Sequence, residues 1–353
     1  EVNLTPKLGS RKPVFSKEQE KELANYILDM ERRLFGLTTY DVRKLAYELA
    51  EKNSIKHYFS EKSKIAGKDW LVGFLKRNSQ ISVRKPEATS AARAMGFNKI
   101  VVETFYELLG NVLNKYKFSP DRIFNCDETG ISTISKSQSK ILARKGRKQV
   151  GVLSSAERGQ TVTVEICVSA SGSYMPPMFI FPRVRMNPLL INNSAFPGVW
   201  AETDKSGWMQ TDIFLKWFDH FIQFTNASQN NPVLLLLDGH ATHVKNIELI
   251  NKARDNGVVI ICFPPHTTHR LQPLDVGFMK PLSSYYDIET RNWLRNNPGK
   301  VITSYQIVQL FTQAFVKAAT IQTALNSFKK TGISPYNSLN FTDADFIASD
   351  TTN

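Results

Sequence analysis

Three aspartates in the last two thirds of the chain have the residue type and the surroundings for metal chemistry. Asp127 and Asp238 each directly follow an apolar run typical of a buried strand, and Asp275 follows a Leu-Gln-Pro-Leu segment. A carboxylate beside a buried strand is costly unless a cation meets it. Three such carboxylates, brought together, would form a site of hard oxygen ligands for a divalent metal ion. Such a site has the equipment to break or join phosphodiester bonds.

Each aspartate also has a purely structural explanation. Asp127 could open a turn that caps a helix, Asp238 could belong to a strand-ending Asp-Gly turn, and Asp275 could cap a helix. Their joint occurrence favours a common site. We expect Asp127 after the first strand and Asp238 after the fourth, and these strands can be neighbours in a mixed sheet. The 36 residues between Asp238 and Asp275 suffice for a helix, a strand and a turn, so a late helix could bring the third carboxylate to the other two.

The expected cofactor follows from the ligand type. Two divalent ions held by carboxylates can activate a water or a 3′-hydroxyl and stabilise the leaving oxygen. Mg²⁺ suits this role because it prefers oxygen ligands and keeps waters that a substrate can displace. We expect Mn²⁺ to substitute for it.

Two histidine pairs, His240-x-x-His243 and His266-x-x-His269, lie close to these aspartates in the sequence. Four histidines could form a zinc site, but no cysteine lies at ligand spacing around them. The alternative is that these histidines, together with Glu128, line the carboxylate site and contact phosphate or orient a ligand. For any single histidine a structural role is a further alternative.

The charge of the chain is unusual. The 353 residues, which predict two or three domains, carry a net charge of +13. The first hundred residues hold 20 basic and 12 acidic side chains, so +8 of the total lies there. A strongly basic balance favours a polyanionic partner, most simply nucleic acid. A basic but otherwise ordinary soluble surface is the alternative.

The three cysteines, in apolar runs, favour buried free thiols in a reducing compartment. No signal peptide is visible at the start. No apolar stretch reaches the roughly 18 residues of a membrane span, so we expect no membrane partner. The chain lacks an initiator Met, which suggests a fragment with a missing N-terminal part.

The N-terminal region predicts three short helices. The first begins at the capping box Ser16-x-x-Gln19, the second follows Thr38-x-x-Asp41, and the third spans 67–78. Lys68, Lys76 and Arg77 on the third helix would face outward, which suits a helix-turn-helix unit. A generic three-helix bundle is the alternative.

Basic residues also flank this unit. Arg11 and Lys12 lie in an extended arm, and Arg84, Lys85 and Arg93 lie in a linker among Ser, Thr and Ala. A connecting helix is expected over 100–116. All five basic residues are candidates for phosphate contacts.

From Pro120 onward the pattern changes to a strand, a hairpin over 161–181, a helix, a fully apolar strand over 233–237, a helix, a strand and further helices. The apolar strand is typical of the middle of a parallel sheet. This order predicts a mixed α/β sheet with helices packed on its faces. Residues from Ser338 onward are expected to form a fraying tail.

The motifs that surround the three aspartates resemble a known family. They are Asn-x-Asp-Glu-Thr-Gly at 125–130, Asp-Gly-His-x-x-His at 238–243, and Pro-Pro-His-x-x-His-x-Leu-Gln-Pro-Leu-Asp-Val-Gly at 264–277. These motifs resemble the DDE endonuclease domain of pogo/Tigger-like transposases, a group that includes jerky-like and centromere-protein-B-like proteins. Residues 15–20, the Gly-x-x-Trp-x-x-x-Phe-x-x-Arg pattern at 67–77, and Gly-Ile-x-Pro at 332–335 extend the resemblance over nearly the whole chain.

The resemblance implies a fold and a site. The fold is an α/β RNase H-like catalytic domain, a mixed sheet flanked by helices, preceded by an all-α helix-turn-helix DNA-binding domain. Asp127, Asp238 and Asp275 would be the metal ligands and catalytic residues. The implied domain bounds are a basic arm over 1–14, the DNA-binding domain over 15–80, a basic linker and connecting helix over 81–118, the endonuclease domain over 119–337, and a tail over 338–353.

The resemblance also implies an activity, namely nicking at transposon ends and attack of the 3′-hydroxyl on target DNA, typically at a TA step. The partners would be double-stranded DNA with terminal inverted repeats and a second copy of the chain, acting in the nucleus. The first helix-turn-helix of the family's bipartite unit is absent here. The alternative function is a domesticated DNA-binding or chromatin protein that does not cut DNA.

Overall fold

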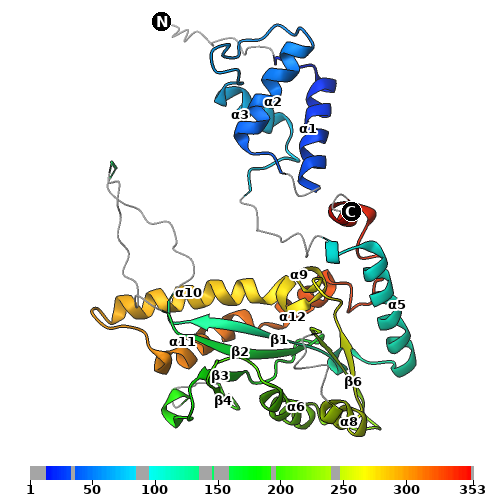
Figure 1. The fold of residues 1–353 in the computed structure, drawn as a ribbon, viewed down its shortest axis with the longest axis vertical. Helices are drawn as coiled ribbons and strands as arrows, with labels where there is room; N and C mark the ends of the chain where they lie inside the picture. The colour runs from blue at the N-terminus through cyan, green and yellow to red at the C-terminus, as the bar shows by residue number, and fades with distance from the viewer. Residues whose placement is uncertain are drawn as a thin grey trace, which may run out of the picture. The chain divides into compact units, whose positions relative to one another are not determined.

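The structure, a computed structural model, describes residues 13–32, 36–84, 95–134, 145–146, 159–191, 196–239 and 247–350 (Figure 1). Two compact units are present. The first comprises residues 1–95 together with 342–353, and the second comprises residues 96–341. None of the helices in the described part of the chain combines the length and apolarity needed to span a lipid bilayer.

The first unit contains the three expected helices, α1 (Lys17–Arg32), α2 (Thr39–Lys52) and α3 (Lys68–Arg77). Both predicted capping boxes form. The Gln19 side chain accepts the Ser16 N–H at 2.9 Å, and Ser16 Oγ accepts the Gln19 N–H at 3.3 Å. Thr38 and Asp41 exchange the same pair of bonds at 2.9 and 3.2 Å. Because each box satisfies N–H groups that the helix cannot, the sequence fixes where α1 and α2 begin.

Aromatic side chains hold this unit together. Phe15 packs edge-on against Trp70, with ring centroids 6.0 Å apart, and Trp70 stacks on Phe74 at 5.3 Å. Leu23 and Ala46 bring α1 and α2 into the same cluster. Burial of the apolar face of α3 leaves its charged face to solvent, as the helical spacing predicts.

The prediction of a fraying tail over residues 338–353 is wrong for residues 343–350. Asp343–Asp350 form helix α13, which contacts α1 within the first unit. Phe346 is buried, with 5% of its surface exposed. The Asp345 carboxylate also accepts the Thr342 N–H at 2.9 Å and so caps the helix. The eight-residue segment Asp-Ala-Asp-Phe-Ile-Ala-Ser-Asp has only two large apolar residues, and they are adjacent, so its periodic signal was too weak to predict this helix.

The second unit is built on one six-stranded sheet. Its strands are β1 (Ile123–Ser132), β2 (Thr161–Ser169), β3 (Met178–Pro182), β4 (Trp200–Asp204), β5 (Val233–Leu237) and β6 (Val258–Cys262), in the order β4-β3-β2-β1-β5-β6. Only β2 runs antiparallel to its neighbours. The predicted hairpin and the predicted apolar strand in a parallel setting are both confirmed.

Helices cover both faces of the sheet (Figure 1). On one face, α6 (Thr211–Thr225) and α8 (Ile247–Asp255) bury Trp217, Phe221 and Leu249 against alternate strand residues. On the other lie the π-helix η3 (Leu274–Phe278), α10 (Met279–Asn296), α11 (Ser304–Ala318) and α12 (Ile321–Lys330). The remaining elements are α5 (Lys99–Tyr116), α9 (Thr268–Leu271) and the short 3₁₀ turns Pro120–Arg122 and Pro188–Leu190.

Two strand predictions need correction. β1 does not end at Cys126 but continues to Ser132, paired with β2 along its length. Residues 127–130 are therefore strand and not a turn with a helix cap. β4 was not predicted because Trp-Ala-Glu-Thr-Asp shows no clear alternation, and this strand makes β5 the fifth strand instead of the fourth.

An ion pair links α1 to α3 in the first unit. Arg77 donates to the Glu20 carboxylate from Nε at 2.9 Å and from Nη2 at 2.7 Å. The Glu20 side chain is only 7% exposed, whereas that of Arg77 is 40% exposed. The side-chain hydrogen bond to Glu20 raises the pKa of Arg77. The Arg77 guanidinium therefore links α3 to α1.

We expect Arg77→Ala to destabilise the first unit by about 1–3 kcal/mol, because it leaves a buried carboxylate without its donors. The matched control is Lys76→Ala, since the exposed Lys76 lies on the same turn and no ion pair is found for it within the described residues. Amide hydrogen exchange in α1 and α3 of the full chain measures the effect. Equal exchange rates in the two variants would contradict this role of Arg77.

Candidate active site

Asp127 lies inside β1, where the strand is paired with β2 and has just passed its pairing with β5, which ends at Asn125. Its neighbour across β2 is Ile166. The residue is half-buried, and its carboxylate Oδ1 accepts the Glu128 N–H at 2.9 Å. A strand interior offers few donors to a carboxylate, so charge compensation must come from outside the sheet.

Asp238 comes directly after β5, the parallel neighbour of β1. The register pairs Ile123 with Leu234 and Asn125 with Leu236. Extended by two residues, it sets Asp127 level with Asp238 on strands that lie about 4.8 Å apart. The predicted adjacency of the two strands that carry these carboxylates is therefore confirmed.

Asp275 lies in the first turn of η3, which continues directly into α10, and it is exposed. The expectation that a late helix carries the third carboxylate towards the sheet agrees with the contact between η3 and β1. Gly277 presses η3 against α12, because a Cβ there would lie 2.1 Å from Ser327 Oγ. Only a glycine allows this approach.

Asn125 connects the three segments that carry the aspartates. It is fully buried, two residues before Asp127 in β1. Its Oδ1 accepts the Leu274 N–H at 3.0 Å, and its Nδ2 donates to the Leu236 carbonyl at 3.0 Å. Leu274 immediately precedes Asp275, and Leu236 lies two residues before Asp238. The motif contained this residue, but the sequence did not reveal its role because both partners are distant in the chain.

The charge of this cluster is concentrated. Burial is the largest influence on Asp127 and raises its pKa well above the ordinary range. The neighbouring carboxylates of Asp275, Glu165 and Asp238 raise this pKa further, in that order. Asp127 therefore lies within electrostatic reach of both other predicted aspartates. Glu165, which is 1% exposed on β2, is an additional acidic neighbour that the sequence analysis missed. The sequence did contain a signal for this residue, because Glu165 is the one charged residue in the apolar segment 162–168.

The donor set fits a divalent cation in its chemistry. Carboxylate oxygens are the ligands that Mg²⁺ and Mn²⁺ prefer, and their mutual repulsion calls for a positive charge. Within the ranges that the structure describes, however, no three potential ligand side chains converge closely enough to hold an ion as they stand. Mg²⁺ is commonly held by one or two carboxylates together with waters and substrate phosphates. The carboxylates of this cluster are thus sufficient in number for a Mg²⁺ ion that takes its other ligands from water and substrate.

The buried cysteines near the site remain protonated thiols. Burial, with Glu165 as the next contribution, raises the pKa of both Cys126 and Cys167 well above the usual range. A thiolate is the reactive form of cysteine. These side chains therefore belong to the apolar core, as the sequence predicted.

The histidines divide into two groups. His240 and His243 lie outside the described residues, so the four-histidine zinc alternative has no test here. His266 is exposed and has φ of 64°, and a Cβ on Gly96 would lie 2.7 Å from its Cβ. His269 packs edge-on against Phe97, with ring centroids 6.0 Å apart. Packing with the segment that enters α5 accounts for the positions of both described histidines.

The predicted DNA contacts are placed in part. Lys68 and Lys76 are exposed on α3, and Arg84 is exposed with Nε 3.1 Å from Ser82 Oγ. Arg77 is the exception, because its guanidinium holds Glu20. Four further candidates lie outside the described residues, namely Arg11, Lys12, Lys85 and Arg93.

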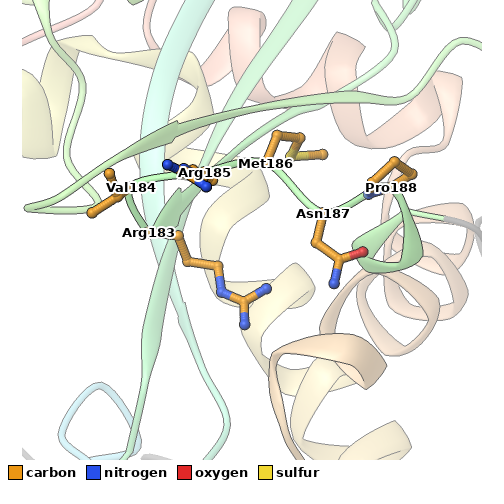
Figure 2. A pocket seen from close by; sticks show the side chains of 6 residues that line it. All are labelled: Arg183, Val184, Arg185, Met186, Asn187 and Pro188. Carbon is orange, nitrogen blue, oxygen red and sulfur yellow. The ribbon is translucent and has the colours of Figure 1, made fainter.

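A separate surface cavity of about 650 Å³ is lined by the loop Arg183–Pro188, which follows β3 (Figure 2). The Arg183 guanidinium lies 5.5 Å from the centroid of the Tyr305 ring, and Asn187 donates to the Tyr305 hydroxyl at 3.2 Å. Figure 2 shows both side chains extending from the same side of the loop. The β2–β3 register sets the start of this loop level with Ser132, about 20 Å from Asp127.

Family comparisons match two parts of the chain. The DDE superfamily endonuclease matches residues 159–334, and the Tc5 transposase DNA-binding domain matches residues 16–85. The first match covers Asp238 and Asp275 and begins after Asp127. The second covers α1, α2 and α3.

Curated relatives share about a quarter of their residues with this chain. The MFS-type transporter clz9 of Cochliobolus lunatus is 25% identical over 90% of this chain and 30% of its own length. The Jerky protein of Mus musculus is 23% identical over 70% of this chain and 45% of its own length. CENP-B homolog protein 2 of Schizosaccharomyces pombe is 22% identical over 88% of this chain and 60% of its own length. The chain thus spans between 30% and 60% of these relatives.

Among solved structures, the Mos1 Strand Transfer Complex has a TM-score of 0.50 and 11% identity, over 94% of this chain and 78% of that chain. With the mixed sheet described above, this likeness confirms the predicted α/β fold with its helical N-terminal domain. The chain carries a DDE-superfamily endonuclease domain and a transposase-type DNA-binding domain. It belongs to the DDE superfamily, and the Jerky and CENP-B relatives confirm its resemblance to the pogo-like group.

The raised pKa of Asp127 predicts a pH-dependent stability. The folded protein holds a proton at Asp127 more tightly than the unfolded chain does. This contribution is complete below the ordinary aspartate pKa of about 4 and is lost as the pH rises through the raised pKa. Without added metal, we expect Asp127→Asn to raise Tm at pH 7.5, by about 2–4 °C per kcal/mol recovered, and to flatten the dependence of Tm on pH.

Thermal unfolding of the full chain between pH 4 and pH 8 provides the measurement. Asp121→Asn is the matched control, since Asp121 is an exposed aspartate just before the start of β1. Its profile should follow that of the wild type. A wild-type Tm that climbs steadily towards pH 8, with no gain from Asp127→Asn, would refute the interpretation.

Proposed function

We propose that this chain is a metal-dependent DNA transposase of the pogo-like type, which cleaves DNA strands at transposon ends and transfers them to target DNA. The observation that supports this most directly is the β1–β5 register, which sets Asp127 level with Asp238, together with the contact of η3, which carries Asp275, with β1. The family's endonuclease and DNA-binding domains agree with it.

The three aspartates would hold the divalent ion or ions, which we propose to be Mg²⁺ with Mn²⁺ as a substitute. When bound, such ions activate a water or a 3′-hydroxyl and stabilise the leaving oxygen. The register of β1 and β5, extended by two residues, sets Asp127 level with Asp238 and supports this arrangement. Asp275 is exposed on η3 and would face the scissile phosphate from the helical side. Glu128, His240, His243, His266 and His269 remain proposed as lining residues.

The DNA-binding function would rest on the first unit. Lys68 and Lys76 on α3 and Arg84 beyond it are exposed cations that suit contacts with phosphates. We propose terminal inverted repeats as the specific ligand, a TA-containing target, a homodimer on DNA and action in the nucleus. The sequence-based bounds stay as proposals, with the domain over 15–80 binding DNA and the domain over 119–337 cutting it.

Replacement of a metal-binding aspartate tests the activity. Wild-type protein with Mg²⁺ or Mn²⁺ should nick a duplex that carries the inverted repeats flanking its own coding sequence. Asp238→Ala should lower the cleavage rate about 1000-fold, the scale expected when several kcal/mol of metal stabilisation is lost, and should leave duplex binding intact. Asp255→Ala, at the exposed end of α8, is the control.

Cleavage by wild type that is indistinguishable from cleavage by Asp238→Ala, in either ion, would contradict the proposal. Binding to the repeats without any metal-dependent nicking would instead support the alternative, a domesticated DNA-binding protein.

The loop Arg183–Pro188 offers a second place for DNA phosphates. Within the described residues no carboxylate pairs with Arg183 or Arg185. Arg suits bidentate phosphate contacts, and the loop lies about six base-pair steps from Asp127.

Replacement of both arginines, Arg183 and Arg185, by Ala should lower the slope of log K against log salt for a 30-base-pair end duplex by about 2. Lys117→Gln, at the exposed C-cap of α5, should leave the slope unchanged. A double variant with the wild-type slope would exclude this contact.

A further inference from the structure

We propose that Asn125 is a positioning residue, which sets the distance between the third carboxylate and the first two. The role rests on the proposed metal-dependent function, but its support is the hydrogen bonding of one buried side chain. Asn125 touches no reacting atom, and it would act through the backbone segments that carry the aspartates.

The bonds of the Asn125 amide join three elements. The side chain belongs to β1, donates to β5 at the Leu236 carbonyl and accepts from η3 at the Leu274 N–H, with both distances at 3.0 Å. A third contact, from Nδ2 to the Cys126 carbonyl at 3.2 Å, stays within β1. Complete burial excludes water as a competing partner. The rigid amide plane thus fixes η3 relative to both strands.

The second anchor of η3 lies on its other side. Gly277 meets α12 so closely that a Cβ would overlap Ser327. Phe278, at the end of η3, packs against Phe315 of α11 with ring centroids 5.9 Å apart. Asp275 lies between the Asn125 bond and these contacts. Removal of the Asn125 hydrogen bond would free only the N-terminal side of η3. Asp275 would then shift, while the packing of Gly277 and Phe278 would keep the rest of η3 in place.

The position requires an amide. A donor must face Leu236 and an acceptor must face Leu274, and of the side chains of this size only Asn supplies both. An aspartate could accept from Leu274 but would lack the donor and would add a negative charge two residues from Asp127. An alanine could do neither. Asn125→Ala therefore tests the bond, and Asn125→Asp tests the acceptor alone.

Thr163→Val is the matched control for loss of a buried hydrogen bond. Thr163 is 1% exposed on β2 and donates to the Gly207 carbonyl at 2.6 Å, and this partner belongs to none of the three carboxylate segments. Valine keeps the shape and loses the bond. The control should lower Tm as the Asn125 variants do, with no effect on metal binding.

The experiment measures Mn²⁺ binding to the full chain by electron paramagnetic resonance of the free ion, together with amide hydrogen exchange over 272–278. We expect Asn125→Ala to weaken Mn²⁺ binding by about 10–100-fold, the range for residues that orient metal ligands. Exchange over 272–278 should also accelerate. Asn125→Asp should keep slow exchange at Leu274, and Thr163→Val should match the wild type in both measurements.

Wild-type Mn²⁺ affinity and exchange in Asn125→Ala, with wild-type binding intact, would overturn the role of Asn125 alone. Equal losses in Asn125→Ala and Thr163→Val would overturn it as well, because a general loss of stability would then explain both. Absence of Mn²⁺ binding by the wild type would overturn the proposed function and this role together.

Discussion

The hydrogen bond between the Leu274 amide and the Asn125 side chain joins positions 149 residues apart, and the candidate site depends on it. The apolar packing that also holds η3, such as that of Phe278 against Tyr174 and Phe315, is less directional than a hydrogen bond in a buried setting. The neutral amide of Asn125 thus keeps the acidic groups close to Asp127. The fold tolerates their repulsion because the hydrogen bonds of this amide hold β1, β5 and η3 together.

The repulsion itself shows a tension between stability and chemistry. The half-buried Asp127, with the carboxylates of Asp275, Glu165 and Asp238 near it, disfavours its own ionised form. An apolar residue in its place would suit the core of β1 better. Groups that a fold holds at a cost are found at functional sites, and here the cost falls on a central strand. The same principle does not apply to Arg77, whose charge is satisfied by Glu20 within the first unit.

The sequence predicts best where the signal is local. The capping boxes, the apolar run 233–237 and the neighbouring first and late strands were all foreseen from spacing and polarity. Asp127 was expected after its strand, with a turn over 127–130 as the structural alternative, yet pairing with β2 continues the strand to Ser132. The roles of Asn125 and Glu165 depend on neighbours that are distant in the chain, and no local pattern encodes them. α13 was missed for the same reason, since its burial depends on α1.

The second unit begins at Gly96, and its first residues lie on the loop that leads to the third carboxylate. A Cβ at Gly96 would lie 3.0 Å from the Pro265 carbonyl. The Arg270 guanidinium lies 5.2 Å from the ring centroids of both Phe97 and Phe341. Residues 97 and 341 border the two chain segments that lead to the first unit. The two ends of the second unit therefore pack on one cation, five residues before Asp275, so these ends and the segment that carries the third carboxylate share one support.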